Sequence, residues 1–216
     1  MNDPPLAEDA IASHLLDALR ACGEILLMDH TNPWELDEAL CAAGFAVGLC
    51  EAQDVQGLDH DFRRRKNTPV NRRHIPILNR MVAEGRLGRK TGVGWYRYPG
   101  GGGLVIDPLV EDLLREEAWF AGVSRVELSD DVLVEYMQLA LINASAALLD
   151  QGDETLAQRI NDVAQHRLGV PEKWGGVLTL GDTIGPAEVC RQLDNLAQGK
   201  DAFWRAHPAL RRRAGR

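Results

Sequence analysis

The chain has 216 residues, enough for one domain or two small ones and for a substantial hydrophobic core. Its hydrophobic share of 45% and charged share of 26% are those of an ordinary globular protein. The formal net charge of −8 argues against a nucleic-acid-binding surface, which requires a basic face. A local group of cations that binds a small anion is still compatible with this charge.

The cysteines are scattered along the chain, as Cys22, Cys41, Cys50 and Cys190. Because they form neither a C-x-x-C pair nor a cluster with histidine, the sequence predicts no metal site and a reducing compartment. No secretory signal pattern appears, and no apolar run approaches the ~18–20 residues that cross a bilayer. We therefore expect a cytoplasmic protein that does not bind membranes.

Apolar residues recur at helical spacing in the first part of the chain, as Ile11, Leu15, Leu19, Cys22 and Leu26. A second helix is predicted after Asn32, a cap residue followed by a proline at the first helical position, and it should end at Gly44. Further helices are expected over 49–56, from about 59 into a basic run, and around 77–82.

The basic run comprises Arg63, Arg64, Arg65 and Lys66, with Arg72 and Arg73 nearby. It is either the solvated end of a helix or a docking face for an acidic partner.

The glycine-rich stretch from 99 to 103 is the best boundary in the chain. We predict a first domain over 1–99, a linker over 100–106 and a second domain over 107–216. The second domain should open with a helix from 107 to about 122, with Leu109 and Leu113 facing inward. Later helices are expected over about 129–148, 154–168 and 186–198. Because alternation of period two is almost absent, the predicted fold class is all-α.

The most distinctive stretch runs from Gly85 to Tyr98, with the sequence GRLGRKTGVGWYRY. Its glycines permit tight turns or close backbone approach, and Trp95 and Tyr96 give it a part to bury. It resembles the G-x-L-G-x-K-[TS]-G-x-G-[FW]-Y loop of the 3-hydroxyacyl-CoA dehydrogenase C-terminal domain. The stretch GFAVGLCEAQDVQGLD, from Gly44 to Asp59, is similar to the same family's G-F-P-M-G-P-x-E-L-x-D-x-x-G-L-D.

The two halves of the chain match each other with offsets that grow from 122 to 125 to 128. Asp37 and Gly44 align with Asp162 and Gly169, and the stretch 54–57 aligns with 182–185. The resemblance implies two tandem copies of the helical domain, of the type also found in 6-phosphogluconate dehydrogenase, packed like an internal dimer. The alternative is that any two amphipathic helices can be superposed.

A dehydrogenase of this family needs a dinucleotide-binding fold, and the pair Gly92 and Gly94 lies in no β-α-β context. The family's catalytic histidine and glutamate belong to an N-terminal domain for which we find no counterpart. The chain is therefore not expected to bind NAD alone, but only through a separate Rossmann domain. We identify no catalytic and no cofactor-binding residue.

The resemblance does carry over a set of candidate substrate contacts: Ser13, Phe45, Val47, Gly48 and Lys90. Ser13 stands where the family has an active-site asparagine, and a hydroxyl offers fewer hydrogen bonds than an amide. Ala46 and Leu49 replace the prolines of the family's turn. The loop cations Arg86, Arg89, Lys90 and Arg97 are either phosphate contacts for coenzyme A or a solvated surface.

Two functions follow from these observations. The chain resembles the substrate-closing and dimerisation part of a 3-hydroxyacyl-CoA dehydrogenase of fatty-acid metabolism, not competent alone for NAD-dependent oxidation. Alternatively, it is a repurposed non-redox module that binds an acyl thioester or a protein. The candidate partners are a separately encoded NAD-binding domain, acyl-CoA and a second copy of the chain; nucleic acid and membranes are excluded.

Overall fold

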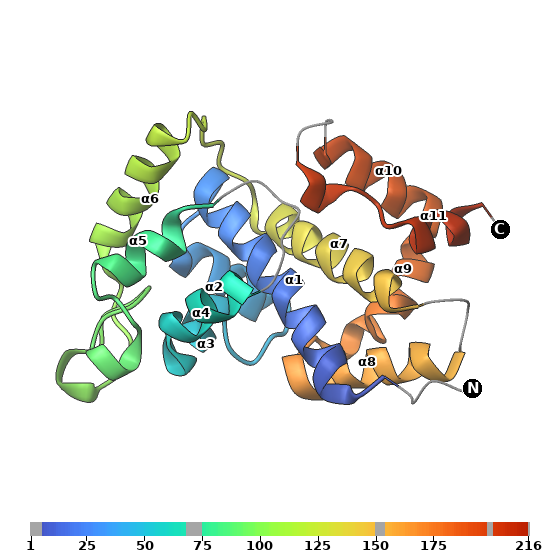
Figure 1. Cartoon of the computed structure of the whole chain (residues 1–216), viewed down its shortest axis with the longest axis horizontal. Coiled ribbons are helices and arrows are strands. Elements are labelled where there is room, and N and C mark those ends of the chain that lie inside the picture. The colour runs from blue at the N-terminus through green and yellow to red at the C-terminus, as the bar shows by residue number, and fades with distance from the viewer. Residues whose placement is uncertain (1–5, 68–74, 150–153, 198–200, 216) are drawn as a thin grey trace. The chain divides into compact units, whose positions relative to one another are not determined.

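The computed structural model describes residues 6–67, 75–149, 154–197 and 201–215. Arg72 and Arg73 of the predicted basic patch lie outside these ranges. Within them the chain forms the helices α1 (Glu8–Asp29), α2 (Pro33–Ala42), α3 (Leu49–Gln56), α4 (Leu58–Asn67), α5 (Ile77–Ala83), α6 (Pro108–Phe120), α7 (Asp130–Leu148), α8 (Glu154–Leu168), α9 (Val177–Ile184), α10 (Pro186–Ala197) and α11 (Pro208–Ala214) (Figure 1). Four short 3-10 helices, η1 (Arg89–Thr91), η2 (Pro99–Gly101), η3 (Glu172–Trp174) and η4 (Ala202–Trp204), accompany them. The all-α prediction is confirmed; extended pairing in the described ranges consists of isolated bridges around the glycine loop.

The chain divides into two compact units, one of residues 1–22 with 135–216 and the other of residues 23–134. Helices α1 and α7 each begin in one unit and end in the other. The boundaries of these units differ from those of the two predicted repeats. The repeat boundaries at 99 and 107 concern duplication in the sequence and stay a prediction.

The unit of residues 23–134 is built from α2 to α6, with a core that includes Leu36, Leu40, Leu58, Ile77 and Trp95. The connection after α6 is fastened to the end of α1 by Arg125. Its guanidinium donates to the carbonyls of Met28 at 2.9 Å and Thr31 at 2.6 Å. The bond to Met28 satisfies a carbonyl that the C-terminus of α1 leaves without an intrahelical partner, and the bond to Thr31 holds the segment that follows α1.

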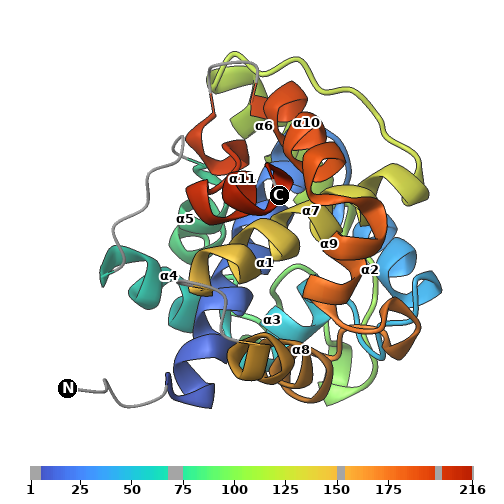
Figure 2. The ribbon, with the colours of Figure 1, turned by 90° about the vertical axis from the view of Figure 1, so that its right-hand side faces the viewer.

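The other unit holds α8 to α11, and α10 and α11 lie side by side (Figures 1 and 2). Its core includes Met137, Leu141, Ile160, Leu193 and Trp204. Asn143 of α7 fixes the approach to α11, because its side chain donates to the carbonyl of Arg205 at 3.0 Å and accepts from the N–H of His207 at 2.7 Å.

The predicted helix starts and stops agree with the structure at several points. Asn32 caps α2, with its side-chain oxygen 3.0 Å from the N–H of Glu35, and Pro33 occupies the first turn. One orientation was wrong: Leu109 is 52% exposed, whereas Val110 and Leu113 face the core. The inward placement of Leu113 is confirmed, and Val110 and Leu114 face the core in place of Leu109.

Helices α3 and α9 show the same local construction. Each has eight residues, each follows a glycine, and each ends at a glycine with φ near 100°, at Gly57 (100°) and Gly185 (97°). Each is also capped by a side chain of the preceding helix, Asp37 for α3 and Asn161 for α9. The sequence alignment had paired Asp37 with Asp162, one position away. These parallels support the duplication, which remains a proposal.

None of the helices in the described part of the chain combines the length and apolar character needed to span a membrane.

Candidate functional site

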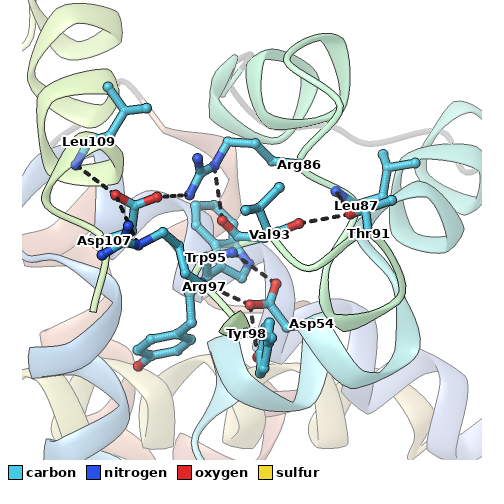
Figure 3. A network of polar contacts seen from close by, with 12 residues as sticks. Asp54, Arg86, Leu87, Thr91, Val93, Trp95, Arg97, Tyr98, Asp107 and Leu109 are labelled. Carbon is cyan, nitrogen blue, oxygen red and sulfur yellow. Dashed lines mark hydrogen bonds and ion pairs between the residues drawn. The ribbon is translucent and has the colours of Figure 1, made fainter. Parts of the chain in front are cut away.

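A buried carboxylate holds the glycine loop in place. Asp54, in α3, is completely buried. Its Oδ1 accepts a hydrogen bond from the N–H of Trp95 at 2.9 Å, and its Oδ2 accepts from the N–H of Tyr96 at 2.9 Å and the hydroxyl of Tyr98 at 3.0 Å. Figure 3 shows this carboxylate among the loop residues that it binds. The loop is therefore a fixed structure.

Two glycines of the loop are required by this close approach. A Cβ on Gly94 would lie 2.5 Å from Cγ of Asp54, and one on Gly88 would lie 2.9 Å from Cα of Asp54. Gly88 also adopts a φ of 97°, which side chains rarely tolerate. The spacing of these glycines is thus set by the fit of the loop over α3.

The indole of Trp95 adds a second anchor. The side chain is fully buried, and its Nε1 donates to Oε1 of Gln53 at 3.0 Å. Gln53 in turn donates from Nε2 to Asp61 at 2.9 Å. The loop is thus tied to α3 and, through Gln53, to α4.

Tyr96 joins the loop to a cap of α3. Its hydroxyl donates to Asp37 at 2.9 Å, and Asp37 also accepts the N–H groups of Cys50 at 2.8 Å and Glu51 at 2.9 Å. Gly48 leaves room for this cap, because a Cβ there would lie 2.6 Å from Oδ1 of Asp37. One carboxylate therefore serves both the start of α3 and the loop.

Arg86 connects the loop to α6. Its Nε donates to the carbonyl of Gly94 at 3.0 Å and its Nη2 to Asp107 at 2.6 Å. Asp107 caps α6 by accepting from the N–H of Leu109 at 3.3 Å (Figure 3). Since Arg86 and Asp107 are both buried, this guanidinium is committed to internal partners.

The electrostatics of the cluster are dominated by burial. Desolvation raises the pKa of Asp54 to about 6, against the lowering effect of the hydrogen bonds from Tyr96, Trp95 and Tyr98. Desolvation also raises the pKa values of Asp37 and of the Tyr96 and Tyr98 hydroxyls. Both oxygens of Asp54 already accept bonds from the protein, so the carboxylate is placed to position the loop and not to exchange protons with a substrate.

The other loop cations lie at the surface. Lys90 forms an ion pair with Asp59, which lowers the pKa of that carboxyl mainly through its hydrogen bond. The guanidinium of Arg89 lies 5.9 Å from the ring centre of Tyr98, and Nε of Arg97 lies 3.9 Å from Oδ1 of Asp107. Arg89, Lys90 and Arg97 are all exposed, and of these Arg97 lies near the buried carboxylate of Asp107.

The predicted substrate contacts fall into separate places. Phe45, Val47 and Gly48 form the turn between α2 and α3, where Val47 is exposed and the other two are buried. Lys90 lies beside the end of α3, because a Cβ on Gly57 would lie 2.8 Å from its Nζ.

Ser13 belongs to the other unit, on an exposed face of α1. Its neighbour His14 places Nε2 3.1 Å from the carbonyl of Ala144. For Ser13 and for the residues of the α2–α3 turn and Lys90, contact with substrate stays a prediction. No group of three or more metal-ligating side chains occurs in the part of the chain that the structure describes.

Sequence reasoning missed the residues that hold the loop: Asp37, Gln53, Asp54 and Asp107. A signal was present in the alignment of the two halves, which pairs Asp37 with Asp162 and the stretch 54–57 with 182–185. Sequence spacing alone does not show that both carboxylates face a loop some 40 residues further along the chain.

Residues 14–98 match the family model described as 3-hydroxyacyl-CoA dehydrogenase, C-terminal domain. These residues belong to that family. The chain is also similar to peroxisomal bifunctional enzymes. It is 30% identical to that of Homo sapiens over 185 residues and 28% identical to that of Danio rerio over 186, each match covering 78% of this chain and 26% of the relative.

Among solved structures, the dehydrogenase part of multifunctional enzyme 1 from C. elegans superposes with a TM-score of 0.75 at 20% identity. The superposition covers 96% of this chain and 48% of the C. elegans chain. This likeness shows the fold. The chain spans about a quarter of the length of the curated relatives it matches.

Proposed function

We propose that this chain is the helical portion of a 3-hydroxyacyl-CoA dehydrogenase and that it works with an NAD-binding domain carried by another polypeptide. The observation that carries the proposal is the family match over 14–98 together with the anchored glycine loop. A loop held by Asp54, Arg86 and Trp95 is a rigid surface against which another domain can close and exclude water from a reacting centre.

The 216 residues on their own are expected not to oxidise a hydroxyacyl substrate. The buried carboxylates of the loop are bonded to protein donors, and the sequence reveals neither a pyrophosphate-binding turn nor the family's catalytic histidine segment. NAD would therefore be held by the partner domain, and the helical portion would contribute the acyl-CoA side of the site.

Reconstitution tests this proposal. Purified chain is incubated with NAD⁺ and a 3-hydroxyacyl-CoA, with and without the separately purified NAD-binding domain of the human peroxisomal bifunctional enzyme, and NADH formation is followed. We expect NADH only when both polypeptides are present. Robust turnover by the 216 residues alone would overturn the proposal, and so would a complete failure of the two polypeptides together to form NADH.

Ser13 gives the reconstitution a sharper readout. If it occupies the family's asparagine position, Ser13→Asn restores an amide donor and acceptor and should raise turnover of the reconstituted pair. Ser13→Ala should lower it. Because Ser13 is exposed, neither change is expected to alter folding by more than ~0.5 kcal/mol.

A second candidate function is a non-redox module that binds an acyl thioester or a protein. The altered turn does not favour it strongly, because Leu49 is buried and fits against Gly23, where a Cβ would lie 3.7 Å from its Cγ. The serine at position 13 is the observation in its favour. Calorimetry with acyl-CoAs of several chain lengths decides: tight binding without a partner domain supports the module, and no heat with any of them removes its acyl-thioester form.

We further propose a cytoplasmic location, on the basis of the scattered cysteines, and self-association as a homodimer, because the chain resembles the dimerisation part of the family. Sedimentation of the purified chain tests the second point, and fractionation of the source cells tests the first, which matters because the relatives are named as peroxisomal.

A further inference from the structure

A cleft of about 610 Å³ lies beside the glycine loop in the unit of residues 23–134. It is bounded by α5, by the loop and by α6, with a lining that includes Arg80, Glu84, Val93, Leu109, Asp112 and Glu116. Helices α5 and α6 lie side by side (Figure 1), and Figure 3 shows Leu109 and Val93 on the same side of the loop.

The outward face of α6 extends this cleft. Residues 109, 112, 116, 119 and 120 fall within one stripe at ~100° per residue, and all are exposed. Leu109 is 52%, Trp119 75% and Phe120 66% exposed, and the two aromatic rings pack edge to face with centres 5.0 Å apart. An exposed Trp–Phe pair that continues a cleft is typical of an interaction surface.

The charge on this surface is acidic. The guanidinium nitrogens of Arg80 lie 2.9 Å, 3.2 Å and 3.4 Å from carboxylate oxygens of Glu84, Glu116 and Glu117. One cation is therefore shared among three carboxylates. Asp112 adds a further exposed carboxylate to the lining. The other cation of the lining, Arg86, is already paired with Asp107. A partner that presents phosphates, such as nucleic acid or an anionic membrane, would be repelled.

We propose that the cleft and the outward face of α6 dock a basic amphipathic helix of a partner protein. The surface has apolar groups at its two ends, Leu109 at one and Trp119 with Phe120 at the other, and carboxylates between them. The complementary helix carries lysines or arginines in its middle and apolar residues toward both ends. Docking would cover the aromatic pair, and charge complementarity would fix the register.

The lining includes Arg86 and Val93 of the glycine loop but none of the residues predicted to contact substrate. The test of docking uses a synthetic peptide without NAD⁺, acyl-CoA or an NAD-binding domain, so its failure and a failure of reconstituted NADH formation are distinguishable.

Trp119 provides the assay. It is 75% exposed, whereas Trp34 is half-buried and Trp95, Trp174 and Trp204 are buried, so acrylamide quenches Trp119 most strongly. The probe is a synthetic leucine–lysine peptide about as long as α6, with its lysines central and its leucines on one face toward both ends. We expect saturable binding that protects the chain from quenching and weakens with added salt. A scrambled peptide of identical composition should not protect it.

Matched variants locate the site, with binding measured by calorimetry so that loss of the tryptophan does not remove the signal. Asp112→Lys and Trp119→Ser are each expected to weaken peptide binding by roughly tenfold. Glu38→Lys, an equal charge reversal on an exposed position of α2, should change it less than ~2-fold. Circular dichroism verifies that the variants fold. Equal binding of the scrambled peptide, or equal effects of Asp112→Lys and Glu38→Lys, would overturn the proposal.

Discussion

Replacing Gly94 by alanine tests whether the glycine loop is really fastened over Asp54. Gly94 does not have a positive φ, so the backbone itself accepts a side chain there. If the site were open, alanine would stabilise the protein by about 0.4–1 kcal/mol, because it restricts the unfolded chain. The structure predicts the opposite sign.

The magnitude follows from the contacts around the added methyl group. It would lie 2.5 Å from Cγ of Asp54 and 2.6 Å from Cα of Gly88, and the second of these is backbone that does not swing aside. The loop must lift, which weakens the hydrogen bonds that the N–H groups of Trp95 and Tyr96 donate to Asp54, at about 1 kcal/mol each, and disturbs the packing of the buried indole. We expect a net loss of about 3 kcal/mol in the free energy of unfolding.

Urea unfolding, followed by circular dichroism and by tryptophan fluorescence, measures this loss. Gly92→Ala is the control, since Gly92 has a φ of 76° but nothing within 4 Å of an added Cβ. It carries only the cost of a left-handed conformation, about 1–2 kcal/mol. Because the chain forms two compact units, both probes must give the same transition before one free energy is assigned. If Gly94→Ala stabilises the protein, or costs less than Gly92→Ala, the anchoring argument is wrong.

Other predictions concern charge. Burial raises the pKa of Asp54 to about 6 from an ordinary 3.8. The folded state therefore binds the proton of this carboxyl more tightly than the unfolded chain does. The contribution of Asp54 to the free energy of unfolding consequently grows as pH falls from 6 to 4. The advantage of wild type over Asp54→Asn in the free energy of unfolding should therefore widen by about 2 kcal/mol across that range in urea titrations, and a narrowing gap would show that the hydrogen bonds outweigh desolvation. Arg86→Met leaves the carboxylate of Asp107 buried without its partner and should cost about 3–5 kcal/mol, read as a lower urea midpoint. Lys90→Ala breaks only an exposed ion pair with Asp59 and should cost less than ~1 kcal/mol, so a change in acyl-CoA binding by this variant would report on contact and not on folding.

The helices could be predicted because their signals are local. Asn32 followed by proline marks the start of α2, and the glycine at 57 marks the end of α3. Leu109 shows the limit of such signals, because the sequence has apolar residues at 109, 110, 113 and 114 and does not say which of them face the core. In the folded chain Val110, Leu113 and Leu114 are buried and Leu109 is exposed, and this choice depends on the elements that pack on α6, including α5.

The loop could be recognised but not explained from the sequence. Its cations suggested phosphate contacts, yet Arg86 is buried against Asp107, and neither partner differs in type from an ordinary surface residue. The carboxylate that organises the loop comes from α3, and its role depends on a contact between residues about 40 positions apart. Sequence spacing has no means of showing which of many aspartates makes such a contact.

A comparison of the caps on α3 and α9 explains why the first must be an acid. Asp37 accepts two backbone N–H groups at the start of α3 and also the hydroxyl of Tyr96, so both of its oxygens act as acceptors. Among the described residues, Asn161 accepts the N–H of Leu178 and donates from its NH₂ to Thr179 at 3.1 Å. An amide at position 37 would turn a donor toward either a backbone N–H or the tyrosine hydroxyl. The charge at position 37 is therefore a consequence of the loop, and within the described residues the α9 cap has no aromatic loop residue to serve. If the halves arose by duplication, the aspartate and the loop would have been kept together in the first half and released together in the second.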